Sequence, residues 1–592
     1  MQSTGYKRLR GIPASPGIAI GRAFIYRKET PRISTRRIPA GRVEAEVERF
    51  LNSLHQAGEE IRRIQHLVEV EQGSDMAQIF EAQRAMLEDV EVKDQTLKLI
   101  RERHFSAEQA FSVTLGQMKR VFEDIENEYL RARLSDVVDI EHQVLVRMAG
   151  GELKALHALR ANTVVVLHDL LPSEVVQLGR RPVKGIVTDA GGATSHTSII
   201  ARSMGLPTIV GAGNGSREIK SGDLVIVDGN EGVVHVRPGQ EVLRFYRTQR
   251  RRQLRRERDL SARRELPAVT LDHQDIVLMA NVDVPNELQL AIDNGARGVG
   301  MYRTEFLYMG YRLPSETEQL DCYAHIVEAA APHPVVIRTI DLGGDKLAHI
   351  LNTAPESNPF LGWRGIRICL DTPDLFKTQL RALLRAGTRG EVQILLPMVS
   401  SINELRRARA ILEEAKYELR AETNSFQEEC KVGVMVEVPS VALMAEQFAP
   451  ETDFFSLGTN DLTQYTLAVD RGTARVANLY DPYHPAVLKL MKIVADTGKR
   501  HHIPVSICGE MAGDPLATIL LLGMGIESLS ISPGMIPEVK EVVRAVNLVE
   551  ARKITNHCLD LGTGSKVREF LKDAMQAHLD IPPSWQSWKE SR

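Results

Sequence analysis

The chain has 592 residues, of which 43% are hydrophobic and 26% charged, and its formal net charge is −3. This length corresponds to about two to four domains, with enough apolar material for several cores. The near-neutral charge excludes a protein whose overall field is built for nucleic acid.

Three further properties predict a cytoplasmic protein that does not enter a membrane. The five cysteines are dispersed and contain no CxxC pair, which is typical of a reducing compartment. Lys7, Arg8 and Arg10 are not followed by an apolar segment, so we expect no signal peptide. No stretch reaches the roughly 18 uncharged apolar residues that span a bilayer.

The first part of the chain changes its pattern twice. Residues 8–27 and 163–236 contain short β-branched runs, which are typical of strands. Between them, residues 42–148 have almost no proline or glycine, and apolar residues recur at helical spacing, which predicts a helical bundle. We therefore predict an α/β domain made of residues 1–41 and 149–240, with residues 42–148 inserted as a helical subdomain.

A basic run follows at residues 244–264. Taken alone, such a run could indicate nucleic-acid binding. However, it is interleaved with Glu257 and Asp259, and no recognised nucleic-acid-binding module accompanies it. We interpret residues 241–265 as a solvated helix that links two domains.

From residue 266 to residue 580, short apolar strands alternate with helical stretches, and residues 581–592 form a tail. The predicted strands end near Ala280, Met301, Thr339, Pro397, Glu437, Leu457, Ile507 and Ile531. Eight strand–helix units over about 300 residues predict a (β/α)8 barrel, in which the chemistry lies at the carboxyl ends of the strands.

Polar residues follow most of these strands. Arg303 and Arg338 are suited to gripping a phosphate, and Arg471 could add a contact to a carboxylate. Each arginine taken singly could instead be a salt-bridge residue, but three on one rim favour a site for an anionic ligand.

The same rim carries carboxylates and a thiol. Glu437 and Asp461 are hard oxygen ligands of the kind that Mg²⁺ prefers. Cys508 is placed where a thiol would face the bound ligand and could exchange a proton with carbon, although a lone cysteine is more often a small buried hydrophobe.

His196 lies in a different setting, in the α/β domain. It follows Gly191 and Gly192 and begins a helix-like run, so unpaired backbone N–H groups and the helix dipole would favour an anion there. A lone histidine is usually structural, but neighbouring hydroxyl groups and an imidazole that is neutral near pH 7 favour a residue that carries a phosphoryl group. The sequence contains neither GxGxxG nor GxxxxGK[ST], so it shows no nucleotide cradle.

At these residues the sequence resembles the enzyme I family of the bacterial phosphoenolpyruvate:sugar phosphotransferase system. The resemblance covers nearly the whole chain, through residues 15–19, 191–211, 301–307, 338–346, 358–364, 436–440, 458–465 and 508–514. It implies that phosphoenolpyruvate binds the barrel with Mg²⁺, that its phosphoryl group passes to His196 and then to the phosphocarrier protein HPr, and that pyruvate is released.

The resemblance also implies a role for each site residue. Arg303, Arg338, Asn460 and Arg471 match substrate contacts, Glu437 and Asp461 match the metal ligands, and Cys508 matches the proton donor. Asp461 thereby counts both as a substrate contact and as a metal ligand. HPr would dock on residues 42–148, and a homodimer would form through the barrel.

One position departs from the family pattern. Leu171 occupies a place where the family often has a threonine that faces the active histidine, which leaves the orientation of the His196 ring open.

Two groups of relatives are alternatives. Pyruvate phosphate dikinase and phosphoenolpyruvate synthase share these parts, but they need an ATP-binding domain for which we find no segment. Paralogues in nitrogen-regulatory phosphorelays use the same chemistry and typically add a GAF domain, of which we see no sign in this sequence.

Overall fold

The computed structural model describes residues 5–578, with gaps in between. These gaps are residues 27–32, 34–36, 73–82, 85, 88, 124–133, 150–161, 170–177, 179–182, 192–200, 202–204, 263, 284–286, 309–311, 344–355, 357, 423–424, 472 and 474. The chain divides into two compact units, Met1–Arg255 with Ser584–Arg592 and Arg256–Pro583.

The first unit contains a mixed eight-stranded sheet with the order β1-β8-β7-β3-β4-β5-β6-β2. Its strands are β1 (Lys7–Arg10), β2 (Ile12–Ser15), β3 (Ile18–Ile25), β4 (Thr163–Leu167), β5 (Val183–Thr188), β6 (Thr208–Val210), β7 (Leu224–Asp228) and β8 (Val233–Val236). The central strands β3, β4, β5 and β6 pair in parallel, and the others pair antiparallel. Strand β4 is buried along its whole length, which explains its unbroken β-branched sequence.

The helical region interrupts this sheet between two adjacent strands. β3 and β4 are hydrogen-bonded neighbours, yet 137 residues separate the end of β3 at Ile25 from the start of β4 at Thr163. The described helices in this interval are α1 (Val43–Gln72), α3 (Val90–Arg103), α4 (Ala107–Glu123) and α6 (Leu134–Met148). This observation confirms that the helices are inserted in the α/β sheet.

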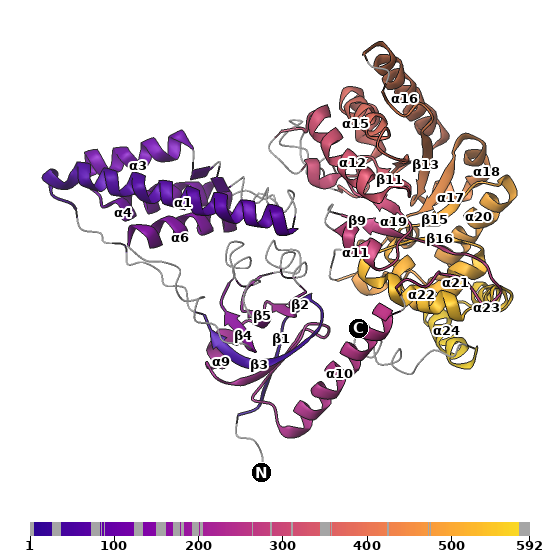
Figure 1. Ribbon diagram of the computed structural model, residues 1–592, viewed down its shortest axis with the longest axis horizontal. Coiled ribbons are helices and arrows are strands. Elements are labelled where there is room, and N and C mark those ends of the chain that lie inside the picture. The colour runs from indigo at the N-terminus through magenta and orange to yellow at the C-terminus, as the bar shows by residue number, and fades with distance from the viewer. Residues whose placement is uncertain are drawn as a thin grey trace. The chain divides into compact units, whose positions relative to one another are not determined.

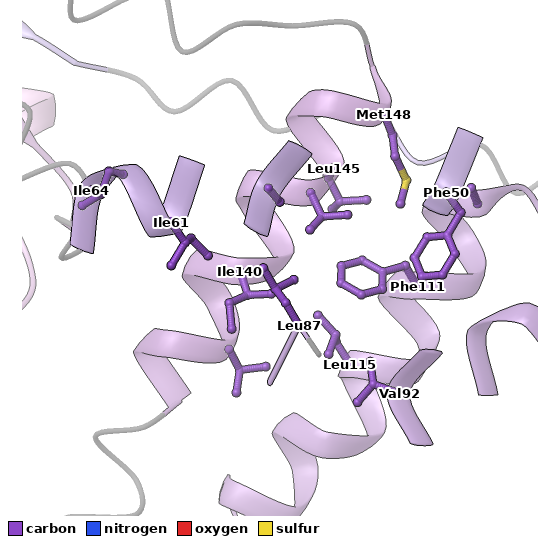
Figure 2. Packing of buried hydrophobic residues seen from close by; sticks show 14 of the residues in the cluster. Phe50, Ile61, Ile64, Leu87, Val92, Phe111, Leu115, Ile140, Leu145 and Met148 are labelled. Carbon is purple, nitrogen blue, oxygen red and sulfur yellow. The ribbon is translucent and has the colours of Figure 1, made fainter. Parts of the chain in front are cut away.

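The inserted helices bury a common apolar core (Figure 2). The rings of Phe50 on α1 and Phe111 on α4 lie 5.7 Å apart and are tilted by 48°, a geometry that aromatic pairs favour. Arg49 ties the same two helices together, because its guanidinium pairs with Glu108 at 2.7 Å and also donates to the carbonyl of Met148. The helical periodicity of residues 42–148 therefore reflects real packing.

The basic segment forms the single helix α10 (Gln240–Ala262), and the division between the two units falls inside it. Near its start, Leu243 and Tyr246 pack on Ile226 of strand β7. The Tyr246 hydroxyl also lies 3.0 Å from Nε2 of His235 on β8. These contacts attach the first part of α10 to the sheet.

The second unit is a closed barrel of eight parallel strands, with its helices around the outside (Figure 1). The strands are β9 (Val277–Val282), β10 (Val299–Tyr302), β11 (Val335–Arg338), β12 (Val392–Leu396), β13 (Lys431–Val436), β14 (Phe454–Leu457), β15 (Val505–Ile507) and β16 (Ser528–Ile531). All eight end within two residues of the positions that the sequence predicted, and the multidomain α/β fold class is confirmed.

The described helices of the barrel unit follow the strands in alternation. They are α11 (Glu287–Asp293), α12 (Glu316–Ala330), α14 (Ile366–Asp371), α15 (Pro373–Ala386), α16 (Ile402–Glu422), α17 (Pro439–Leu443), α18 (Ala445–Phe448), α19 (Thr459–Leu467), α20 (Pro485–His501), α21 (Pro515–Met524), α22 (Ile536–Ala545), α23 (Leu548–Asp560) and α24 (Gly564–His578). Helix α9 (Gly215–Glu218) belongs to the first unit. In the described part of the chain, no helix combines the length and the apolar character needed to cross a membrane.

The barrel interior is filled by side chains from successive strands. Met301, Val336, Leu395, Met435, Phe454 and Cys508 form one buried cluster. This buried layer lies beneath the polar residues at the strand ends. All five cysteines of the chain are free thiols.

Candidate active site at the carboxyl ends of the barrel strands

A cavity of about 480 Å³ opens at the carboxyl ends of the barrel strands. It is lined by all seven residues that the sequence predicted for the barrel site, namely Arg303, Arg338, Glu437, Asn460, Asp461, Arg471 and Cys508. They come from the ends of strands β10, β11, β13, β14 and β15 and from the loop after α19, so the closure of the barrel brings them together.

Arg338 is the most enclosed cation of this cavity. It ends strand β11, and its guanidinium lies 2.6 Å from Oε1 of Glu305 and 2.7 Å from Oδ2 of Asp341. Burial lowers the pKa of Arg338, but Glu305 and Asp341 more than offset this effect, so the guanidinium is held in its charged form. Its Nε is buried and has no hydrogen-bond partner among the described residues.

Two further arginines hold more open positions. Arg303 follows strand β10, and its Nη1 lies 2.9 Å from Asp283, while about a third of its side chain stays exposed. Arg471 donates from Nη1 to Oε1 of Glu510 at 3.2 Å. Both therefore have partners that an anionic ligand could replace at the surface of the cavity.

Asn460 is fixed by a reciprocal pair of hydrogen bonds. Its Nδ2 donates to Oε1 of Glu510 at 3.1 Å, and its Oδ1 accepts from the backbone N–H of Glu510 at 3.0 Å. Since Arg471 shares the same Glu510 oxygen, this glutamate orients both predicted ligand contacts.

The two predicted metal ligands lie in a cluster of buried charges. Oε1 of Glu437 accepts from the backbone N–H of Met398 at 2.6 Å, and Oδ2 of Asp461 accepts from Nη2 of Arg364 at 2.8 Å. Burial, with the nearby carboxylates of Asp341 and Asp461, raises the pKa of Glu437. Three acidic groups, Asp341, Glu437 and Asp461, thus lie close together in one buried region, with Arg338 and Arg364 as the neighbouring cations.

Cys508 occupies the floor of the cavity and is 1% exposed. Burial raises the pKa of its thiol to about 11, with an opposing hydrogen bond from Ser456 and a further raising effect from Glu437. The thiol is thus protonated at neutral pH and available as an acid rather than as a nucleophile.

His196 and Leu171 lie outside the described residues. The described flanks show that the two segments leave from the carboxyl ends of the neighbouring parallel strands β5 and β4, which end at Thr188 and Leu167. Gly191, just before the His196 segment, has φ +108°, a conformation that side chains with a Cβ rarely adopt.

Arg364 is a residue of the site for which the sequence analysis predicted no individual role. It pairs with Asp341 through Nε at 2.9 Å and through Nη2 at 3.0 Å, besides its bond to Asp461. Because it lies 26 residues after the end of β11, no rule about strand ends could single it out. An isolated bridge between Gly343 and Arg364 brings it back to the rim.

Comparisons with known proteins agree with this architecture. Three family models match the chain in order: PEP-utilising enzyme, N-terminal (residues 10–133), PEP-utilising enzyme, mobile domain (residues 159–232), and PEP-utilising enzyme, PEP-binding domain (residues 257–548).

Relatives named phosphoenolpyruvate-protein phosphotransferase match along nearly the whole chain. Those of Bacillus sp. (strain S) and Geobacillus stearothermophilus are each 42% identical over 96% of this chain and 98% of their own length. The relative of Haemophilus influenzae is 39% identical over 95% of this chain and 98% of its own. This chain therefore belongs to the phosphoenolpyruvate-protein phosphotransferase family of PEP-utilising enzymes, known as enzyme I.

Proposed function

We propose that this enzyme transfers the phosphoryl group of phosphoenolpyruvate to its own His196 and then to the phosphocarrier protein HPr, releasing pyruvate. This would be the first step of a sugar phosphotransferase system. The observation that carries the proposal is that seven residues chosen for this chemistry line one cavity. Membership of the family supports the same activity.

The charges of the cavity suit phosphoenolpyruvate, which carries a phosphate and a carboxylate on a three-carbon enol. Arg303 and Arg338, which both line the cavity, would hold the phosphate. Arg471 and Asn460, which share Glu510, would hold the other end of the substrate. Fixing both ends orients the bridging oxygen for transfer.

Glu437 and Asp461 would hold Mg²⁺. They fit this ion because both are hard carboxylate ligands that follow neighbouring strands, and because a further carboxylate, that of Asp341, lies close to Glu437. When bound, the cation would supply charge neutralisation for the phosphoryl oxygens.

Cys508 would complete the reaction as the proton donor. After the phosphoryl group has left, the enolate of pyruvate has an electron-rich C3. The S–H bond breaks, an enolate oxygen lone pair forms the C2=O bond of pyruvate, the C2=C3 electron pair forms the new C3–H bond, and the sulfur keeps the S–H electron pair as a thiolate. A thiol that is neutral before the reaction is the form that this step needs.

We propose the following division of labour along the chain. Residues 1–41 and 149–240 carry His196, residues 42–148 bind HPr, residues 241–265 link the two halves, residues 266–580 bind phosphoenolpyruvate, and residues 581–592 are a tail. A histidine that must meet two different partners in turn needs a movable domain. We further propose that the barrels pair into a homodimer and that the enzyme works in the cytoplasm.

The deciding experiment is incubation with radiolabelled phosphoenolpyruvate and Mg²⁺ in the absence of nucleotide. We expect label on the wild-type protein and none on His196→Ala, with the label passing to added HPr. Label retained on the His196→Ala protein would refute the proposal.

A further inference from the structure

Ser456 is a polar residue in the apolar interior of the barrel. It lies on strand β14, two residues after Phe454, which belongs to the buried interior cluster. Because side chains alternate along a strand, Ser456 projects on the same side as Phe454. It is fully buried, and a hydroxyl in such a place is costly unless it forms a hydrogen bond.

The hydroxyl of Ser456 donates to the sulfur of Cys508. The distance between Oγ and Sγ is 3.2 Å, within the range of a hydrogen bond to sulfur. The sulfur in turn points its weak donor toward the carbonyl of Leu457 at 3.7 Å. Ser456 therefore occupies an acceptor position of the sulfur, while the thiol proton is directed toward the carbonyl of Leu457.

The backbone of Cys508 is fixed independently. Its N–H donates to the carbonyl of Leu457 at 3.1 Å, and its carbonyl accepts from Nδ2 of Asn281 at 2.9 Å. Asn281 is itself oriented by Ser530, whose Oγ donates to Oδ1 at 2.6 Å. Since these bonds hold the backbone, the Ser456 hydroxyl acts on the side chain alone.

We infer that Ser456 is a positioning residue for proton delivery, which orients the Cys508 thiol and stabilises the thiolate left behind. The inference rests on the proposed function of Cys508. As the Cys508 S–H bond breaks and the C3–H bond of pyruvate forms, the sulfur gains a full negative charge, and the Ser456 O–H bond points at it. The thiolate then takes a proton from solvent, which restores the thiol.

The electrostatics of the cavity explain why this hydrogen bond matters. Burial opposes the thiolate, and the neighbouring Glu437 opposes it further. Hydrogen bonds to ionised groups are roughly twice as strong as neutral ones. Removing the hydroxyl should therefore slow protonation by roughly 10- to 100-fold and leave the earlier phosphoryl transfer unchanged.

The test separates the two half-steps in a single turnover of the full-length enzyme. Rapid quenching measures phosphohistidine, and lactate dehydrogenase measures keto-pyruvate. We expect Ser456→Ala to form phosphohistidine at the wild-type rate while keto-pyruvate lags behind, and Ser456→Thr, which restores a hydroxyl, to shorten the lag. The pH dependence of this delay should also differ between Ser456→Ala and wild type.

Ser506→Ala is the matched control. Ser506 is the register partner of Ser456 on strand β15, and its hydroxyl donates to the carbonyl of Phe455 at 3.3 Å. We expect no lag in this variant. The inference would be overturned if Ser456→Ala formed keto-pyruvate as fast as phosphohistidine. It would also be overturned if the rates of phosphohistidine and keto-pyruvate formation fell equally. Failure of wild type to label His196 would instead overturn the proposed function, and this inference with it.

Discussion

Asp461 and Arg364 form an ion pair of 2.8 Å between helix α19 and a loop that follows strand β11, 97 residues apart in the sequence. Arg364 simultaneously grips Asp341 through two nitrogens. A single guanidinium thus holds together two carboxylates of the rim. This contact offsets part of the charge of the buried carboxylates.

Replacing Arg364 by glutamine should destabilise the barrel. The change removes the cation that pairs with both Asp341 and Asp461, and removing one partner of a buried ion pair costs about 3 to 5 kcal/mol. Arg364→Lys keeps the charge but loses the bidentate contact to Asp341, so we expect a smaller loss. Urea denaturation monitored without Mg²⁺ would measure both, and equal stability of Arg364→Gln and wild type would contradict the prediction.

Glu437→Gln should alter how stability depends on pH. The folded-state pKa of Glu437 is raised, so the folded protein binds a proton that the unfolded chain has released. The stability that the protonated Glu437 side chain contributes to the fold is therefore lost as the pH rises from about 4.5 to about 8.

We accordingly expect the metal-free Glu437→Gln variant to be more stable than wild type at pH 8 and to lose this advantage toward pH 5. Thermal unfolding in EDTA at both pH values would measure it. An advantage that is the same at pH 5 and pH 8 would show that Glu437 does not titrate in this window.

Cys508→Ala should separate phosphoryl transfer from pyruvate formation. The variant keeps the arginines and carboxylates of the cavity, so phosphoenolpyruvate should still bind and phosphorylate His196. Keto-pyruvate should form slowly, because the enol must then be protonated without the thiol. Equilibrium binding of phosphoenolpyruvate and single-turnover pyruvate formation would check both parts. Unaltered pyruvate formation would argue against Cys508 as the donor.

Phe111→Ala should damage the inserted helices without damaging the barrel chemistry. Phe111 is 1% exposed and packs on Phe50, so truncation should lower the stability of the bundle by about 3 to 5 kcal/mol. We expect transfer to HPr to fall while His196 is still labelled by phosphoenolpyruvate. Val113→Ala, at a position of the same helix that is 39% exposed, is the control for stability. Loss of His196 labelling in Phe111→Ala would contradict this division of labour.

The barrel could be predicted from sequence because each strand carries two signals at once. A short, mainly apolar strand forms the wall, and polar residues within a few positions of its end mark the rim, as with Glu437 after Val436 or Asp461 four residues after Leu457. Three-dimensional closure then places these rim residues around one cavity.

Arg364, Glu510 and Ser456 were harder to predict as parts of the site. Arg364 reaches the rim through a long loop, Glu510 acts by orienting Asn460 and Arg471, and Ser456 lies inside a strand, where a small residue attracts no notice. Their roles depend on distances across the barrel, which the order of residues in the chain does not contain.

The direct pairing of β3 with β4 has a consequence for how such enzymes could diversify. Parallel neighbours need a crossover of only about a dozen residues, yet here the crossover contains an entire helical subdomain. The inserted helical subdomain can be exchanged or redesigned while β3 and β4 keep their pairing. With the carrier protein docked on residues 42–148 as proposed above, a change of this insert would alter the choice of carrier without altering the residues of the barrel cavity.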